Sequence, residues 1–264
     1  MQPDSFSRRW LVTLALAAAC GRASRDTRAT TGPRRGKKLH TDPANAGLAA
    51  RPRHPSLSAP PGLTRPGLTP GSRDGLLRVP PNYQPDRPLP LLLLLHGAGG
   101  SAQDIVAHLA PLADAAGIIL LAPDSRGRTW DVVLGGFGAD VLAIDELLDW
   151  TFERCAVDRK HVGIGGFSDG ASYALSVGLA NGDLFTHVLA FSPGFMEPPA
   201  LVGRPRIFVS HGTRDAILPI DHASRIFVPK LEAARYRVRF REFEGPHTVP
   251  DDVAREALEW FTAS

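Results

Sequence analysis

From about residue 71 onward, the spacing of apolar residues switches repeatedly between a strand pattern and a helix pattern. Short continuous apolar runs, typical of strands buried on both faces of a sheet, occupy residues 76–79, 91–95, 117–122, 161–164, 187–191, 206–210 and 238–243. Between them, apolar residues recur every three or four positions, as in amphipathic helices, over residues 102–116, 140–152, 170–179, 221–234 and 251–261. Strands that alternate with helices indicate an α/β fold, in which helices cover both faces of a mostly parallel sheet. We therefore predict one domain over residues 71–264.

The first twenty residues have the layout of an export signal. Ser7-Arg8-Arg9 precedes a short apolar run that ends in small residues, and paired arginines in this place are typical of the twin-arginine export route. The run is much shorter than the roughly 18 apolar residues of a membrane-spanning helix. Ala17-Ala18-Ala19-Cys20-Gly21 is similar to a lipobox, in which the cysteine is lipidated after cleavage. We predict residues 1–20 to direct export across a bacterial inner membrane, giving a periplasmic protein or a lipoprotein anchored at Cys20. Secretion is the alternative.

Residues 21–70 carry no periodicity and few large apolar side chains, but many prolines and arginines. Such a composition cannot bury enough surface to offset the entropy of ordering it, so we predict a disordered tether. Residues 1–70 also hold 12 Lys and Arg against 3 Asp and Glu, whereas the rest of the chain holds 18 against 24. The net charge of +3 therefore comes from the N-terminal segment. A nucleic-acid partner is not expected, since it requires a basic face on the folded domain, and membrane contact is expected only through the anchor or tether.

Composition also limits the cofactors. With only two cysteines, the chain has no disulfide framework and no multi-cysteine zinc site. The glycines of His96-Gly97-Ala98-Gly99-Gly100 match neither of the common phosphate-binding patterns. We expect neither a metal nor a cofactor, and the sequence leaves the oligomeric state open.

One motif points to nucleophilic catalysis. Gly166-Phe167-Ser168-Asp169-Gly170 has the form G-x-S-x-G, and it stands between a predicted strand and a predicted helix. In this turn, known as the nucleophile elbow, the strand and helix backbones come too close for side chains, so glycines flank the serine. The strained turn lifts the serine hydroxyl above the sheet at the N-terminus of the helix. We predict Ser168 to be a nucleophile.

A serine hydroxyl needs a base, and the base needs a group that orients it. In the fold that uses this elbow, the chain order is serine, then an acid, then histidine. Asp215 follows the predicted strand over residues 206–210, and His247 lies in a Gly-Pro loop after the last predicted strand, residues 238–243. We predict His247 as the base and Asp215 as its partner. His211 is interpreted as a packing residue near the acid.

Acyl transfer places negative charge on a carbonyl oxygen, which backbone N–H groups must stabilise. One donor should be the N–H of Asp169, the residue after the nucleophile. The second should come from the loop His96-Gly97-Ala98-Gly99-Gly100, with Ala98 as the first candidate and Gly99 as the alternative. The side chain of Asp169 is expected to point away from the developing charge.

These pieces together resemble the α/β-hydrolase serine esterases of the phospholipase/carboxylesterase type. The matching segments are His96–Gly100, Gly166–Gly170, His211–Asp215 with Pro219, and Gly245–His247. The resemblance covers the chain from about residue 76 to its end. It implies an α/β-hydrolase fold and esterase or lysophospholipase-like activity without a cofactor. The predicted function is hydrolysis of small-molecule carboxylic esters with short to medium acyl groups, with a lysophospholipid or a thioester as further candidate substrates. Many relatives carry glutamine where this chain has Asp169, which bears on the substrate class.

Two further expectations concern access and selectivity. Ser192–Pro205 is rich in proline and too short for more than a helical turn, so no cap domain is predicted. Trp130, Phe195 and Leu218 are candidate walls of a substrate pocket.

Polyester, feruloyl or acetylxylan esters and peptides are alternative substrates for the same catalytic residues. A catalytically silent binding protein on the same fold is the non-enzymatic alternative.

Overall fold

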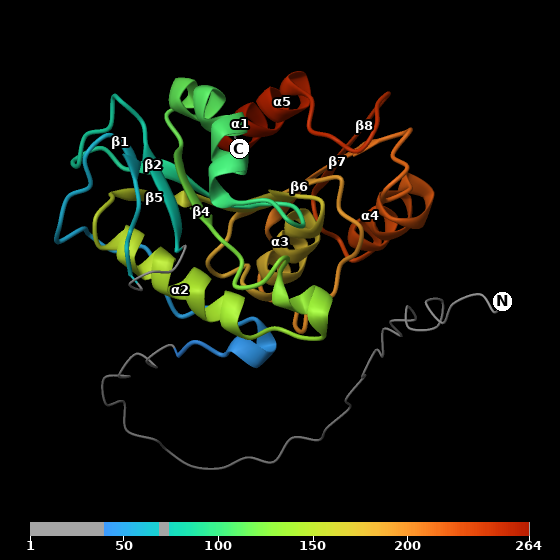
Figure 1. Cartoon of the computed structure of the whole chain (residues 1–264), viewed down its shortest axis with the longest axis horizontal. Coiled ribbons are helices and arrows are strands. Elements are labelled where there is room, and N and C mark those ends of the chain that lie inside the picture. Colours follow the sequence, from blue (N-terminus) through green and yellow to red (C-terminus); the bar gives the residue numbers. More distant parts are fainter. Residues whose placement is uncertain (1–39, 69–73, 264) are drawn as a thin grey trace, which may run out of the picture. The chain divides into compact units, whose positions relative to one another are not determined.

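An eight-stranded sheet runs through the part of the protein that the computed structural model describes, residues 40–68 and 74–263 (Figure 1). The strands are β1 (Gly62–Thr64), β2 (Gly75–Val79), β3 (Leu89–Leu95), β4 (Ile119–Pro123), β5 (Val157–Phe167), β6 (His187–Phe191), β7 (Arg206–Gly212) and β8 (Val238–Phe243). Their order is β1-β2-β4-β3-β5-β6-β7-β8. β1 and β2 are antiparallel to their neighbours, and the pairs from β4 to β8 are parallel. The predicted mostly parallel sheet is confirmed.

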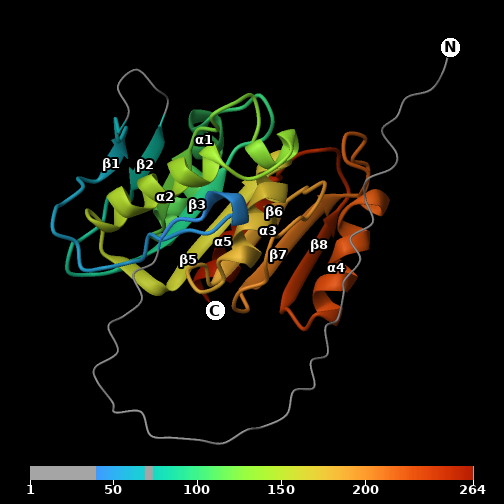
Figure 2. The same ribbon diagram turned by 90° about the horizontal axis from the view of Figure 1, so that it is seen from below.

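Helices cover both faces of the sheet, as the alternating pattern predicts (Figure 2). The α-helices are α1 (Ala102–Ala116), α2 (Ala139–Phe152), α3 (Asp169–Ala180), α4 (Ser224–Ala233) and α5 (Asp251–Thr262), with short 3-10 helices at Pro43–Asn45, Asp131–Leu134 and Ile220–His222. Successive side chains of a strand point to opposite faces. In β3, Leu92 and Leu94 pack with α1 and α5, whereas Leu91, Leu93 and Leu95 pack with α2, α3 and α4. The continuous leucine run thus fills two core layers at once.

The element boundaries follow local chemistry. Helix α1 begins after Ser101, whose hydroxyl accepts the N–H of Asp104, and ends at Gly117, which has a left-handed φ of 67°. This is the helix predicted from the apolar spacing. The helix predicted over residues 221–234 is instead two pieces, because Ala223 has a non-helical backbone (φ −130°, ψ −105°) between the 3-10 turn and α4.

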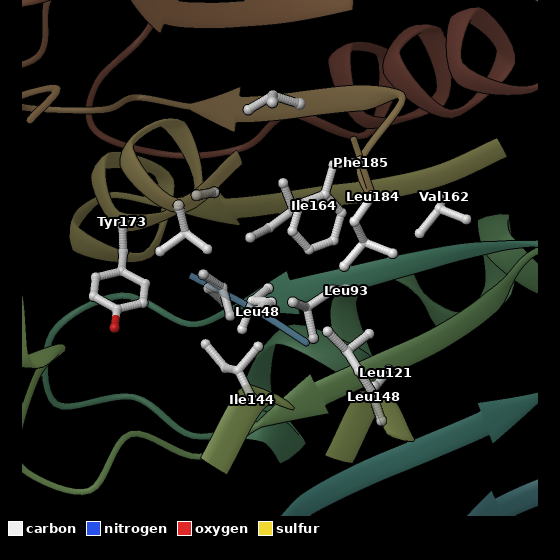
Figure 3. Close-up of a cluster of buried hydrophobic side chains, with 14 of the residues drawn as sticks. Leu48, Leu93, Leu121, Ile144, Leu148, Val162, Ile164, Tyr173, Leu184 and Phe185 are labelled. Atoms are coloured by element: carbon white, nitrogen blue, oxygen red, sulfur yellow. The ribbon is translucent and has the colours of Figure 1, made fainter. Parts of the chain in front are cut away.

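Residues 40–68 correct the prediction of a tether over residues 21–70. They belong to the same compact unit as the sheet, which spans Leu39–Ser264, so the predicted domain start at residue 71 is also wrong. Leu48 is buried among side chains of β3, β5 and α2 (Figure 3). β1 then extends the sheet by pairing with β2.

Hydrogen bonds from the domain to the backbone explain why this segment is ordered without periodicity of its own. The side-chain oxygen of Asn181 accepts the N–H of Leu48 at 2.9 Å, and its amide donates to the Ala46 carbonyl at 2.7 Å. Asp145 on α2 accepts the N–H groups of both Ala49 and Ala50 at 2.8 Å. Polar side chains that bind backbone groups help to offset the ordering entropy, and an apolar pattern does not reveal them.

Several sequence predictions lie outside the described residues. These are the export signal over residues 1–20, Cys20, and the tether up to residue 39. Within residues 40–68 and 74–263, no helix is both long and apolar enough to cross a membrane. Cys155 is a free, buried thiol, and burial raises its pKa to about 12. Ser192–Pro205 contains no helix, in agreement with the prediction of no cap domain.

Candidate active site

Ser168 stands at a strained turn between β5 and α3. Its backbone has φ 57° and ψ −120°, a left-handed conformation that is costly for a residue with a side chain. A Cβ at Gly166 would lie 2.5 Å from the Gly170 carbonyl carbon, and one at Gly170 would lie 2.2 Å from the Leu95 carbonyl oxygen. The two flanking glycines are therefore required by close backbone contacts, as the elbow motif predicts.

The three residues predicted to form a triad lie in one hydrogen-bonded chain. His247 Nε2 is 2.9 Å from Ser168 Oγ, and His247 Nδ1 is 2.6 Å from Asp215 Oδ2. Because the carboxylate only accepts, the Nδ1 proton points to Asp215 and Nε2 is free to accept the serine proton. The geometry suits a general base next to a nucleophile.

Two loops bring the acid and the base together. Asp215 lies after β7 and His247 after β8, and the loops touch where the Arg214 N–H donates to the Gly245 carbonyl at 3.0 Å. The ring of Phe167, next to the serine, packs against the ring of His247 with centroids 4.7 Å apart. These contacts hold the imidazole over the elbow.

Asp215 is almost fully buried yet remains a carboxylate. Burial raises its pKa, but hydrogen bonds from the Leu218 N–H, from His247 and from the Ile217 N–H outweigh burial, so the net pKa lies below its ordinary value. One oxygen, Oδ1, accepts both backbone N–H groups, which leaves Oδ2 for His247. The acid is thus charged and fixed in orientation.

His211, interpreted from the sequence as a packing residue, supports this loop. Its fully buried ring donates from Nε2 to the Leu218 carbonyl at 2.7 Å, and its Nδ1 accepts from the Ser224 hydroxyl at 2.7 Å. Burial lowers the pKa of His211, so the ring is neutral. Nε2 also lies 3.3 Å from Asp215 Oδ2. Sequence reasoning missed Ser224, which carries no motif signal.

The loop after β3 lies against the elbow. A Cβ at Gly97 would lie 3.4 Å from the Cβ of Ser168. The Gly99 N–H is already bonded to the Arg128 carbonyl at 2.7 Å, whereas no hydrogen bond among the described residues takes the Ala98 N–H. Asp169 is the first residue of α3, where N–H groups have no partner within the helix. The structure therefore favours Ala98 over Gly99 as the second donor beside Asp169.

The side chain of Asp169 is held rather than free. Its Oδ2 accepts the hydroxyl of Thr129 at 2.7 Å, so the carboxylate is turned toward the segment after β4. No sequence motif singles out Thr129.

A cavity of about 340 Å³ adjoins His247. Its walls are His96, Gly97, Ala98, Gly100, Asp104, Ile105, His108, Phe167, His247, Thr248 and Val249. The cavity thus lies between the loop after β3, the first turns of α1 and the His247 loop. It is a concave and largely apolar site next to the catalytic candidates, as substrate pockets usually are.

The predicted pocket walls lie elsewhere. The assignment of Trp130 is wrong: the ring is fully buried, donates from Nε1 to the His96 carbonyl at 2.8 Å and stacks on Tyr173. An indole N–H needs a partner when buried, and the carbonyl inside the core supplies it. Phe195 and Leu218 do not line the cavity next to His247 either. Leu218 packs on Gly194, where an added Cβ would come within 2.9 Å of it. A role for Phe195 and Leu218 toward substrate stays a prediction.

The described residues hold no cluster of three or more His, Cys, Asp or Glu side chains arranged for a metal ion.

Comparison with known proteins assigns the family. The phospholipase/carboxylesterase family profile matches residues 131–262, half of the chain. The protein belongs to the phospholipase/carboxylesterase family. Solved structures share its α/β-hydrolase fold: esterase PE8 has a TM-score of 0.57 at 22% identity, covering 67% of this chain and 93% of its own. The S-formylglutathione hydrolase FrmB from Staphylococcus aureus has a TM-score of 0.58 at 16% identity, covering 70% and 91%.

Curated relatives match over shorter stretches. The protein named "Putative esterase NocK" of Nocardia uniformis subsp. tsuyamanensis is 32% identical over 146 residues, which are 51% of this chain and 42% of the relative. Feruloyl esterase C of Emericella nidulans is 27% identical over 157 residues, covering 56% and 57%. The chain therefore spans about half the length of the curated relatives it matches.

Proposed function

We propose that the protein is a serine hydrolase of carboxylic esters. The observation that carries the proposal is the hydrogen-bonded chain from Asp215 through His247 to Ser168, at a serine whose backbone is strained. The family and the esterase relatives support the same reaction.

In the first half of the reaction, His247 Nε2 takes the proton of Ser168 Oγ while the oxygen attacks the ester carbonyl. Negative charge then develops on the carbonyl oxygen, where the N–H groups of Ala98 and Asp169 stabilise it. Asp215 holds the imidazole in the required tautomer and stabilises the imidazolium that forms. His247 gives its proton to the leaving alcohol, and the acyl group remains on Ser168.

In the second half, water takes the place of the alcohol. His247 accepts a proton from the water as the water attacks the acyl-enzyme. A second tetrahedral intermediate forms at the same N–H groups and collapses to release the carboxylic acid. Ser168 recovers its proton from His247.

The decisive experiment compares wild type with Ser168→Ala. Wild type should hydrolyse p-nitrophenyl esters and react with a fluorophosphonate probe at Ser168, whereas the variant should do neither. Ser58→Ala, which removes an exposed hydroxyl, is the matched control and should behave as wild type. Wild-type protein that is folded but neither turns over esters nor reacts with the probe would support the silent binding protein instead.

Short to medium acyl esters are the first substrate class to test, and feruloyl esters are the second. Feruloyl esterases recur among the curated relatives, which favours this alternative over the other ester classes. A panel should vary acyl length and include methyl ferulate, acetylated xylan, a polyester and a lysophospholipid. The ratio of kcat/KM between methyl ferulate and a butyrate ester decides between the two leading classes.

We also propose that the protein is exported and anchored by a lipid at Cys20. The paired arginines and the lipobox-like sequence of residues 1–20 support this location. Cys20→Ser should move the full-length protein from the membrane to the soluble fraction of the producing cell. Arg8 and Arg9 changed together to Lys should reduce export through the twin-arginine route. Unchanged fractionation of Cys20→Ser would contradict the lipid anchor.

A further inference from the structure

The segment of residues 125–130, which follows β4, contacts both halves of the site that would stabilise the negative charge. On the elbow side, Thr129 Oγ1 donates to Asp169 Oδ2 at 2.7 Å. On the side of the loop after β3, the Arg128 carbonyl accepts the Gly99 N–H at 2.7 Å. Consecutive residues therefore bind the neighbour of one candidate donor, Ala98, and the side chain of the other, Asp169.

The same segment is fixed at further points. Trp130 Nε1 donates to the His96 carbonyl at 2.8 Å, and the Ser125 N–H donates to His96 Nε2 at 3.1 Å. The segment is also bonded to α2, where Asp140 accepts two backbone N–H groups. One carboxylate oxygen accepts the Arg126 N–H at 2.6 Å, and the other accepts the N–H of Asp131, the residue that follows the segment. Five residues of segment 125–130, all but Gly127, each make one of these hydrogen bonds, so the segment is a rigid support rather than a free surface loop.

We propose that Thr129 is a positioning residue for the stabilisation of the oxyanion, an inference that rests on the proposed esterase function. Its hydroxyl joins the Asp169 side chain to the segment that also holds Gly99. The separation between the Ala98 and Asp169 N–H groups is thereby set through segment 125–130. The bond also gives the Asp169 carboxylate a partner away from the carbonyl oxygen, where a negative group would oppose the developing charge.

The effect should appear in the transition state and not in ground-state binding. Donors must lie about 2.7–3.1 Å from the oxyanion, and loss of one entire donor costs about 10²–10³-fold in kcat. Thr129 removes no donor and only holds one in place, so its loss should cost less. We expect Thr129→Val to lower kcat about 10-fold, with KM changed less than twofold.

The experiment compares Thr129→Val, Thr129→Ser and wild type in the folded full chain. Each is assayed for kcat and KM on a butyrate ester and for affinity to an alkyl trifluoromethyl ketone, which forms a tetrahedral adduct with an oxyanion. Thr129→Val should weaken the inhibitor by the same factor as it lowers kcat/KM, and Thr129→Ser should restore both. The pH profile of kcat/KM should keep its midpoint, since the triad is unchanged. Thr129→Ala serves as the second variant if Thr129→Val does not fold.

The matched control is Thr262→Val, which removes a threonine hydroxyl bond in the last turn of α5 and should change neither constant. Wild-type kinetics in Thr129→Val, or a loss confined to KM or to the folded fraction, would overturn the inference while leaving the esterase intact. A wild-type protein that neither labels with a fluorophosphonate nor cleaves any ester would overturn the proposed function and this inference with it.

Discussion

Gly212 lies so close to Gly245 that a Cβ at position 212 would come within 2.4 Å of the Gly245 carbonyl oxygen. This contact joins the loop that carries Asp215 to the loop that carries His247. We expect Gly212→Ala to separate the two loops and to lower kcat/KM at least about 100-fold, because a misplacement of about 1 Å has that effect. Steady-state kinetics on an ester measure the fall in kcat/KM, and the melting temperature shows whether the variant is still folded. Full activity in Gly212→Ala would show that the loop contact is not needed.

Asp215→Asn tests the acid separately from the loop. The amide keeps the shape and can still accept the N–H groups of Ile217 and Leu218, but it no longer favours the Nδ1–H tautomer of His247. We expect kcat to fall by about 10⁴-fold, as an acid-to-amide change in a triad does, with little loss of thermal stability. A fall of less than tenfold would indicate that another acid orients His247.

Because His187 is buried, we expect the free energy of unfolding to depend on pH. Its ring is buried against Trp260 and Phe261, and burial lowers its pKa to about 4. The unfolded chain binds a proton at about pH 6.5, so stability is full above that pH and falls as the pH drops toward 4. Protonation of His187 should lower the free energy of unfolding by an amount on the order of 3 kcal/mol.

His187→Phe replaces the ring with one that does not titrate. The free energy of unfolding of this variant should change less between pH 7 and pH 4 than that of wild type, as urea titrations at several pH values would measure. His222→Gln, which changes an exposed histidine, is the control. Identical pH dependence in His187→Phe and wild type would rule out this origin of acid sensitivity.

Asn181 tests the unexpected docking of residues 40–68. Its amide binds the backbone of Ala46 and Leu48, and its loss leaves an N–H and a carbonyl group buried without these partners. We expect Asn181→Ala to lower the free energy of unfolding by about 2–3 kcal/mol and to make the chain more sensitive to proteolysis between residues 46 and 61. A wild-type stability and digestion pattern would show that the segment is held by other contacts.

Residues 40–68 differ in this respect from the elements that the apolar pattern predicts. The apolar pattern predicts the strand at Leu91–Leu95 and the helix over residues 102–116. The motif at Gly166–Gly170 predicts the elbow, and the close backbone contacts of its glycines agree with that prediction. Residues 40–68 have no such pattern, since their order depends on polar side chains that lie far along the chain.

In the site, too, some residues are predictable from sequence patterns and others depend on contacts between distant residues. Chain order and loop position were enough to place Ser168, Asp215 and His247 together, because the carboxyl ends of parallel strands meet at one edge of a sheet. The pocket assignment of Trp130 is wrong because position at that edge does not reveal whether a ring points into the core. Thr129 and Ser224 act through single hydrogen bonds between distant residues, which only three-dimensional structure shows.

Access to the site depends on Ser192–Pro205, the segment where a lid would be expected. Hydroxyl groups of α3 fix this segment in place. Ser172 Oγ accepts the N–H groups of Gly194 and Phe195 at 2.9 and 3.3 Å, and Ser176 Oγ accepts the Glu197 N–H at 2.9 Å. A segment bonded to a helix at successive residues is not free to open and close as a lid does.

Activity should therefore not depend on a lipid–water interface. With p-nitrophenyl butyrate or tributyrin, the rate should follow the dissolved substrate concentration and show no jump above the solubility limit. Short and medium acyl esters should be cleaved faster than triolein emulsions, because the cavity next to His247, at about 340 Å³, lies at the small end of the range of ligand pockets. Ser172→Ala, which frees the N–H groups of Gly194 and Phe195, should loosen the segment and raise its hydrogen exchange without creating interfacial activation. A preference for triolein with a rate jump at the interface would show that a lid exists and that Ser192–Pro205 moves.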